Sequence, residues 1–445
     1  MVRRMCRPWW AAAVVLMVAG CAGAGGDAAG IGVAATARSS PTASTGSAAS
    51  ASQSALASQT GATRKRTGPI WLQSLQMTST TTGWALYYSK NPNSSSGVFT
   101  RLARTTDGGR TWTDVTPAAG LPMLATPYAE QVLDPVNAED AYLAVTGATE
   151  DSNNSVNSTV LFATTDGGRT WTKSTTLRAV SFASQLSFAN PQHGFLLLGG
   201  NGGAMGQDQV WLYRTSDAGR HWSLAAASPG ETGAALPAQQ GPGRIPTECD
   251  KYGLDFATAT TGWIASTCNA GLTDGLLVSQ DNGTSWSDQS LPVPATICAG
   301  GACLVRGPQF VGGAGFVTVD PQLGAPALLE TRDQGRTWKR IALPAGVQYP
   351  QITFFSPTQG TLVAGGSQDS FRSTFYTTAN GGQTWTPVPQ GTNFTKIGVN
   401  IDFTTTRDAL AWTTGENSDP VPATSIYQTA NSGRTWHAFT PHLVS

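Results

Sequence analysis

Charged side chains are scarce in this 445-residue chain, and their signs balance. They make up 12% of the residues, with 27 Lys and Arg against 27 Asp and Glu, so the formal net charge at pH 7 is zero. A chain without a net field does not attract a polyanion from solution. We therefore exclude nucleic acid as a partner.

The chain also lacks a long stretch of apolar residues at helical spacing, whereas it has 51 Gly and 14 Trp residues. This composition favours a fold built almost entirely of β-strands. The sequence contains no phosphate-binding loop, dinucleotide fingerprint or nucleophile–base motif. Its four His residues are scattered and its Cys spacings match no common zinc pattern, so we expect neither a cofactor nor a metal.

The N-terminus has the pattern of an export signal. Three Arg residues within the first seven positions precede an apolar run over 9–19 that is too short for a comfortable membrane span. The run ends in Val18-Ala19-Gly20-Cys21, which resembles the lipobox of bacterial lipoproteins. That resemblance implies removal of residues 1–20, lipidation of Cys21, and anchoring to the bacterial cell membrane on the side facing away from the cytoplasm. The alternative is a secretory signal with an incidental cysteine.

Residues 21–66 consist mainly of Ala, Ser, Gly and Thr, with almost no large apolar side chains. Such a segment cannot bury enough surface to offset the entropy of ordering it. We expect a disordered tether between the lipid and a folded domain over 67–445.

The folded part contains four cysteines, an even number, as is usual in an exported protein with disulfides. Four cysteines allow three connectivities, and the short sequence separations favour Cys249 with Cys268 and Cys298 with Cys303.

A short motif ending in tryptophan occurs seven times, and successive tryptophans are 47 to 64 residues apart. This period is the length of one four-stranded propeller blade. The copies are TTDGGRTW (105–112), TTDGGRTW (164–171), TSDAGRHW (215–222), SQDNGTSW (279–286), TRDQGRTW (331–338), TANGGQTW (378–385) and TANSGRTW (429–436).

Each copy has the residues of a tight turn between two strands. The Asp or Asn accepts hydrogen bonds from N–H groups ahead of it, the second Gly supplies a positive φ, and the hydroxyl before the carboxylate bonds across the turn. The Trp begins the outer strand and packs against its neighbours. We assign a structural role to Asp107, Trp112, Asp166, Trp171, Asp217, Trp222, Asp281, Trp286, Asp333, Trp338, Asn380, Trp385, Asn431 and Trp436.

Burial of one indole, about 200 Å² at about 25 cal/mol/Å², contributes up to about 5 kcal/mol before entropy is subtracted. We expect a Trp→Ala change in one copy to cost about 3 to 5 kcal/mol, as a core substitution does.

A second recurrence precedes each copy: a strand, a turn and a further strand, as in LDFATATTGWIAS (254–266). These supply strands one and two of a blade, and the motif hairpin supplies strands three and four. The prediction is an all-β, seven-bladed β-propeller of four-stranded antiparallel blades. The ring closes either by packing the first blade on the last or by adding residues 67–72 to the edge of the seventh blade.

The motif and its repetition resemble the Asp-box, or BNR-repeat, propellers. That group includes sialidases, xyloglucan-cleaving glycosidases, sortilin-type receptors and photosystem II assembly factors. The resemblance is specific for architecture and nearly silent about function, because these relatives include hydrolases, receptors and assembly factors.

The motif loops lie on one face of such a disc, so a ligand site is expected on the opposite face. Aromatic rings near the starts of first strands, beside acidic residues, suit stacking on a sugar or gripping a peptide. Simple packing of the same rings is the alternative. The candidate binding residues are Trp71, Tyr128, Glu130, Arg244, Glu248, Asp250, Tyr252 and Tyr349.

Arg244-Ile245-Pro246 matches an Arg-Ile-Pro motif of sialidases, whose arginine grips the substrate carboxylate. In that family the motif precedes the first box, whereas here it follows the third, and the other sialidase residues cannot be placed. We interpret the match as chance. A xyloglucanase-like enzyme needs two facing carboxylates, and no motif singles out such a pair, so no catalytic residue is assigned.

The sequence therefore favours a monomeric, lipid-anchored binding or assembly scaffold for a protein or glycan ligand. An exported glycoside hydrolase on the same fold is the alternative, and a purely structural envelope protein is a third.

Overall fold

A computed structural model describes most of the chain after residue 65. The described ranges are 66–90, 98–120, 130–148, 157–174, 176–178, 182–199, 209–228, 243–246, 249–267, 275–293, 297, 303–321, 324–365, 373–389, 399–413 and 424–444. The predicted signal and tether, with Cys21, lie outside them, except for Arg66, the last tether residue, which begins the strand Arg66–Pro69. Within these ranges no helix is long and apolar enough to span a membrane, and one short 3-10 helix, η1 (Ala118–Gly120), is present.

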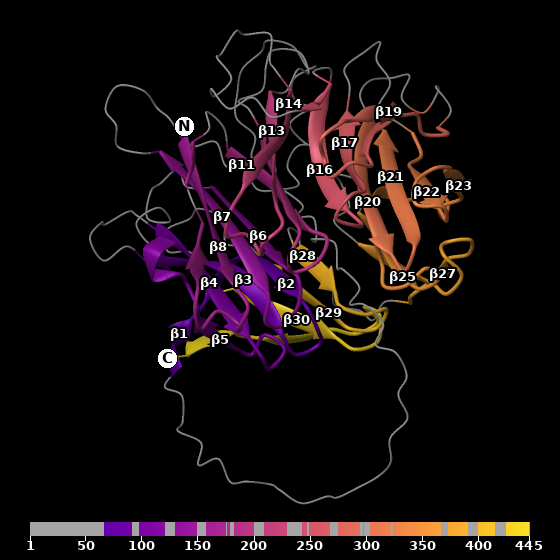
Figure 1. Ribbon diagram of the computed structural model, residues 1–445. Helices are drawn as coiled ribbons and strands as arrows, with labels where there is room; N and C mark the ends of the chain where they lie inside the picture. The colour runs from indigo at the N-terminus through magenta and orange to yellow at the C-terminus, as the bar shows by residue number, and fades with distance from the viewer. Residues whose placement is uncertain are drawn as a thin grey trace, which may run out of the picture.

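Seven antiparallel sheets follow one another around a ring, which confirms the predicted seven-bladed propeller (Figure 1). The first strand of each sheet lies at one edge and contacts the first strands of neighbouring sheets, so the seven first strands are innermost. These inner strands are β2 (Trp71–Met77), β6 (Glu130–Pro135), β11 (Phe182–Phe188), β16 (Asp250–Phe256), β20 (Cys303–Val311), β24 (Gln348–Phe354) and β28 (Val399–Phe403).

Each inner strand pairs with a second strand, and the second pairs with a third. The second strands are β3 (Gly83–Lys90), β7 (Ala141–Ala148), β12 (Gly194–Gly199), β17 (Gly262–Thr267), β21 (Ala314–Pro321), β25 (Gly360–Gly365) and β29 (Ala409–Thr413). The third strands are β4 (Val98–Thr105), β8 (Asn157–Thr164), β13 (Val210–Thr215), β18 (Gly275–Ser279), β22 (Ala327–Thr331), β26 (Thr374–Thr378) and β30 (Ile426–Thr429).

The fourth strands are the outermost ones of the regular blade, and each follows a repeated turn. They are β5 (Thr111–Asp114), β9 (Thr172–Lys173), β14 (Ser223–Ser228), β19 (Ser287–Gln289), β23 (Lys339–Ile341), β27 (Thr386–Pro387) and β31 (His437–Phe439). Every predicted motif copy therefore joins a third strand to a fourth.

Three blades carry strands beyond the predicted four. In blade 2, β10 (Leu177–Arg178) pairs with β8 beside β9. In blade 3, β15 (Gly243–Arg244) adds parallel to β14. In blade 1, the C-terminal strand β32 (His442–Val444) adds parallel to β5, and the N-terminal strand β1 (Arg66–Pro69) pairs with β32.

The ring closes by face-to-face packing of blades 1 and 7 together with these terminal strands. Leu410, Trp412 and Ile426 of blade 7 share one buried cluster with Leu72 and Trp112 of blade 1. The yellow strands of blade 7 accordingly lie beside the indigo strands of blade 1 (Figure 1). The alternative in which residues 67–72 extend blade 7 is wrong, because β1 joins the sheet of blade 1.

Successive blades are joined by stacked aromatic rings. A ring on the second strand of one blade stacks on a ring at the end of the next inner strand, as Phe195 does on Phe256, with centroids 3.3 Å apart. The motif Trp of that next blade, Trp286, then packs edge-on against Phe256. The same stacks are Tyr142 on Phe188, Trp263 on Phe310 and Phe316 on Phe354.

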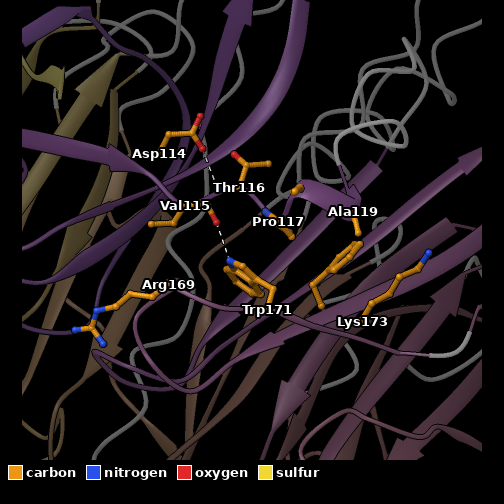
Figure 2. A pocket seen from close by; sticks show the side chains of 11 residues that line it. Asp114, Val115, Thr116, Pro117, Ala119, Arg169, Trp171 and Lys173 are labelled. Carbon is orange, nitrogen blue, oxygen red and sulfur yellow. Dashed lines mark hydrogen bonds between the residues drawn. The ribbon is translucent and has the colours of Figure 1, made fainter. Parts of the chain in front are cut away.

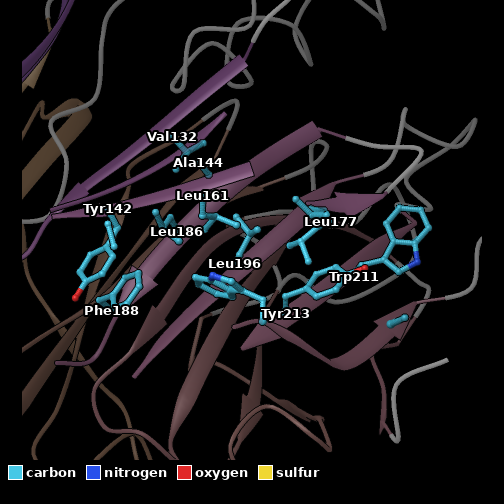
Figure 3. Close-up of a cluster of buried hydrophobic side chains, with 14 residues drawn as sticks. Val132, Tyr142, Ala144, Leu161, Leu177, Leu186, Phe188, Leu196, Trp211 and Tyr213 are labelled. Atoms are coloured by element: carbon cyan, nitrogen blue, oxygen red, sulfur yellow. The ribbon is translucent and has the colours of Figure 1, made fainter. Parts of the chain in front are cut away.

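The interface of blades 2 and 3 shows how this core is assembled (Figure 3). Tyr142 and Phe188 stack at one end of the cluster, and Leu161, Leu186 and Leu196 fill the space beyond them. The cluster contains side chains of both blades, so neither blade can bury this face alone.

A glycine at the start of a second strand makes room for the stacked ring. A Cβ on Gly262 would lie 2.4 Å from the Phe256 ring, and one on Gly194 would lie 2.4 Å from Phe188. Both rings are fully packed against the preceding blade, so they cannot move aside without breaking the stack.

We expect Gly262→Ala to lower stability by about 2 to 3 kcal/mol, because overpacking displaces a buried ring. The melting temperature or the denaturant midpoint of the purified chain measures this. Gly365→Ala is the matched control, since its nearest heavy atom would be 3.4 Å away and its φ is not positive. Equal stability of the two variants would contradict the packing argument.

Candidate functional site

The repeated turn is closed by its own side chains, as the sequence predicted. The Thr105 hydroxyl donates to Asp107 at 2.9 Å and accepts from the Gly109 N–H at 3.0 Å. Asp107 also accepts the Thr111 N–H at 2.8 Å and the Thr111 hydroxyl at 2.6 Å. The other six copies repeat the bonds from the turn N–H groups to the first hydroxyl and to the Asp or Asn side chain. His221 replaces the last hydroxyl in blade 3, and in blades 6 and 7 the Asn380 and Asn431 amides donate to the last hydroxyl.

The predicted positive φ is found at the Gly in the fifth motif position of all seven turns. The residue in the fourth position is left-handed as well. In blades 3, 4, 5 and 7 that preceding residue is not Gly; it is Ala218, Asn282, Gln334 or Ser432, with φ between 59° and 66°. Hydrogen bonds to the motif carboxylate and hydroxyl hold the backbone there despite the steric cost.

The carboxylates of the turns have depressed pKa values because they accept several hydrogen bonds. The backbone N–H and hydroxyl of Thr337, with the hydroxyl of Thr331, lower the pKa of Asp333 to about 2. An acid held in this way stays ionised and is a poor proton donor at neutral pH. The motif carboxylates therefore have a structural role in closing the turns.

The motif tryptophans are less buried than expected. Trp112 and Trp222 are buried, but the other five are half-buried. The sequence expectation of a full core loss for every Trp→Ala change is therefore corrected to the two buried positions. The exposure of a Trp on the outer strand depends on whether the adjacent blade or a terminal strand covers it. Trp112 is covered by β32.

The turns lie on the face where the inner strands end. The Gly108 N–H donates to Thr81, in the turn between β2 and β3, and the Asn282 N–H donates likewise to Thr260 in blade 4. The inner strands therefore begin at the opposite face. We call the starts of the seven inner strands the upper rim. Most of the loops expected on that face lie outside the described residues.

Polar side chains near the ends of the inner strands connect each blade to the next. Gln309 exchanges two hydrogen bonds with the backbone of Phe354. Asp134 accepts the Phe188 N–H at 2.8 Å, and Ser187 accepts the Phe256 N–H at 3.1 Å. These groups satisfy inner-strand backbone that has no further strand to pair with. The sequence shows the recurring polar residue, but its partner lies in another blade.

Asp402 closes this set between the last and the first blade. It lies on β28, is 4% exposed, and accepts the Met77 N–H at 2.7 Å. Burial outweighs this hydrogen bond and raises the pKa of Asp402 to about 7. Its titration therefore affects the stability of the ring closure.

The predicted binding residues divide into four groups. Trp71, Glu130, Asp250 and Tyr349 lie at the upper rim, in the first two positions of β2, β6, β16 and β24. Tyr252 lies two residues further along β16. Tyr128 and Glu248 lie outside the described residues.

Arg244 is separated from the other candidates. It lies on β15, the outermost strand of blade 3, where it pairs with Ala227, and its side chain is exposed. Arg244 therefore lies apart from the inner-strand candidates, and its role in binding stays a prediction. Residues 243–246 pair back onto the blade they follow, and Gly243 approaches the turn of blade 4 so closely that a Cβ would overlap the Thr284 carbonyl.

Tyr349 is the large hydrophobic residue that the described part of the chain leaves exposed, at 38%. It occupies a β-bulge between Gln348 and Pro350 and has φ +46°. In blades 4 and 5 a bulge residue with positive φ is glycine, Gly253 or Gly307. A tyrosine in this conformation has a steric cost, and such backbone strain is often found at functional positions.

The upper ends of blades 4 and 5 contain buried polar groups and two cystines. Cys249 and Cys303 are disulfide-bonded, while Cys268 and Cys298 lie outside the described residues, so the pairing stays a prediction. Lys251 is buried and donates to the Cys249 carbonyl at 2.6 Å. Burial raises the pKa of Asp320 and lowers that of Arg306, since their ion pair is long, at 3.7 Å.

Three described carboxylates of the inner and second strands serve the structure. Asp134 and Asp402 hold neighbouring blades and Asp320 pairs with Arg306. Among the described residues there is no group of three or more His, Cys, Asp or Glu that could hold a metal. The sequence also missed a cavity, described below, that lies on the outer side of the ring between blades 1 and 2.

Comparisons with known proteins find only distant structural likenesses. No family model and no curated protein matches the sequence. Among solved structures, YCF48 bound to a D1 peptide shares 15% identity over 78% of this chain and 89% of its own, with a TM-score of 0.47. A GH74 xyloglucanase from Xanthomonas campestris shares 18% over 85% of this chain, which spans 54% of that enzyme, with a TM-score of 0.45. A PL25 ulvan lyase shares 10%, with a TM-score of 0.43. These likenesses concern the propeller fold alone.

Asp402 gives a prediction about pH. Because its folded pKa, about 7, is above its ordinary 3.8, the folded state holds an extra proton between these values. The contribution of this proton to the free energy of unfolding is complete below about pH 4. It is lost as the pH rises through 7, by at most about 1.4 kcal/mol per pH unit. Asp402→Asn keeps an oxygen acceptor for Met77 and does not titrate. The stability of the native chain relative to this variant should therefore fall between pH 4 and 7 and level off above; a flat difference would contradict the assignment.

Proposed function

We propose that this protein is an extracytoplasmic binding scaffold that holds a protein or glycan ligand at the upper rim of the propeller. The observation that carries the proposal is the exposed, left-handed Tyr349 at the start of β24. It stands where an inner strand begins, and the neighbouring residue on β25, Gly365, has no side chain. A rigid aromatic face presented by an inner strand suits stacking on a sugar ring or an apolar peptide side chain.

The distribution of polar groups supports a binding role. The turn carboxylates and the inner-strand acids Asp134 and Asp402 are engaged in hydrogen bonds that hold the fold. Hydrolysis of a glycosidic bond needs two carboxyl groups facing the bond, one of them able to donate a proton. The acids named above are already engaged in holding the fold, which favours a binding role.

The scaffold is proposed to be anchored by lipid at Cys21, with residues 22–66 as its tether. The lipobox-like Val18-Ala19-Gly20-Cys21 carries this part of the proposal. A cysteine that carries more than one acyl chain attaches a protein stably to a membrane, whereas a single acyl chain binds only marginally.

Tyr349 provides a test in which binding and stability separate. Tyr349→Gly removes the ring and also relieves the left-handed backbone, so the melting temperature should be kept or raised. Binding of the purified chain to a panel of immobilised polysaccharides and to a displayed peptide library should fall about tenfold or more. Tyr349→Phe should retain it, and Arg336→Ala on the turn-bearing face is the control. Unchanged binding by the Gly variant would overturn the proposal, and release of new reducing ends would favour the hydrolase.

Anchoring is tested with Cys21→Ser in the full-length chain expressed in a bacterium. We expect the protein to move from the membrane fraction to the soluble fraction, because the residue that would carry the lipid is gone. Mass spectrometry of the native protein should find the acyl chains on residue 21. Cys6→Ser removes a cysteine of the predicted signal and should leave the distribution unchanged. Equal membrane retention of both variants would contradict lipidation.

A further inference from the structure

A cavity of about 470 Å³ lies on the outer side of the ring, where blades 1 and 2 meet (Figure 2). This volume is within the range of small-molecule sites. One wall is the segment that follows β5, and the other is the turn and outer strand of blade 2. The lining residues are Asp114, Val115, Thr116, Pro117, Ala118, Ala119, Phe162, Gly168, Arg169, Trp171 and Lys173.

The cavity is found beside the motif tryptophan that bonds to a neighbouring blade. In blades 1, 3, 4 and 7 the motif indole donates to the carbonyl of the Gly in its own turn. Trp171 instead donates to the Val115 carbonyl of blade 1, at 2.7 Å. The inner-strand position that carries a stacked Phe in blades 3 to 6 is Pro135 in blade 2, and Trp171 packs edge-on against Trp84, with centroids 6.3 Å apart.

The charges around the cavity are not balanced. Asp114 is already engaged, since it pairs with Arg101 at 2.7 Å and accepts the Tyr87 hydroxyl at 2.8 Å. Arg169 and Lys173 are exposed and make no side-chain hydrogen bond or ion pair to another described residue. They lie on opposite sides of the Trp171 indole (Figure 2). The site therefore combines an indole and apolar floor with a cation at each end.

We propose that this cavity is a binding site for an acidic oligosaccharide, with the C–H face of a hexuronate ring against Trp171 and carboxylates near Arg169 and Lys173. Charge-assisted contacts at both ends favour a ligand with more than one acid group. An extended peptide fits less well, because β5, which leads into one wall, already has β4 and β32 on its two edges. A sugar needs no strand edge and can hydrogen-bond outward to water.

The site is separate from the upper rim, so its test is independent of the scaffold proposal. The full chain is titrated with trigalacturonate and, in parallel, with neutral galactotriose, in isothermal calorimetry at low and at moderate NaCl. We expect binding of the acidic trimer, weakened by salt, and no binding of the neutral one. Arg169→Gln and Lys173→Gln should each reduce the affinity about tenfold. Neither side chain has a hydrogen-bond or ion-pair partner in the part of the chain that the structure describes, so both variants should keep the native melting temperature.

Blade 5 provides a matched control with the same charges. Arg336 occupies the motif position of Arg169, and Arg340 pairs with the third strand as Lys173 does. Arg336→Gln with Arg340→Gln should leave trigalacturonate binding unchanged, as should Tyr349→Gly. The proposal is overturned if this control loses affinity equally, if galactotriose or pentaglutamate binds as well as trigalacturonate, or if no heat of binding is seen at millimolar ligand.

Discussion

The rest of the structure depends on the stacking of one blade's second-strand ring on the next blade's inner-strand ring. Pairs such as Phe195 on Phe256 lie 3.3 Å apart and are fully buried. Such a pair contributes about 0.5 to 1.5 kcal/mol beyond its area, and its geometry fixes the spacing between blades. That spacing requires Gly262 beneath the ring, places Trp286 edge-on against it, and brings the inner-strand backbone within reach of Ser187.

Departures from this interface give individual blades their properties. Met77 occupies the ring position in blade 1, and there the contact with blade 7 relies on the Asp402 carboxylate and on the added strands β32 and β1. Pro135 occupies it in blade 2, where Trp171 turns to blade 1 beside the outer cavity. A repeat protein thus acquires distinct sites by changing one residue of a repeated contact while its neighbours preserve the ring.

The sequence predicted the elements that are local. The period of the motif predicts seven blades, and Thr105, Asp107 and Gly109 close a turn whose bonds span only a few residues. Contacts between distant segments were beyond it. β32 is a three-residue strand without periodicity. Arg244 follows the fourth strand of blade 3 in the sequence and adds to the edge of that same blade. Asp402 bonds to Met77, at the opposite end of the folded chain. The burial of each motif Trp likewise depends on what the adjacent blade and the termini cover.

The same distinction shows which positions are available for function. Side chains that close turns or join blades are fixed, because a change leaves a buried donor or a displaced ring. Tyr349, in a bulge of β24, and Arg169, the sixth motif residue of blade 2, carry no such duty, because neither side chain makes a hydrogen bond or ion pair to another described residue. A ligand site built from these positions can change in one blade without loosening the ring. Binding chemistry on this fold is therefore expected at the bulges and beside the turns, at a few positions per blade.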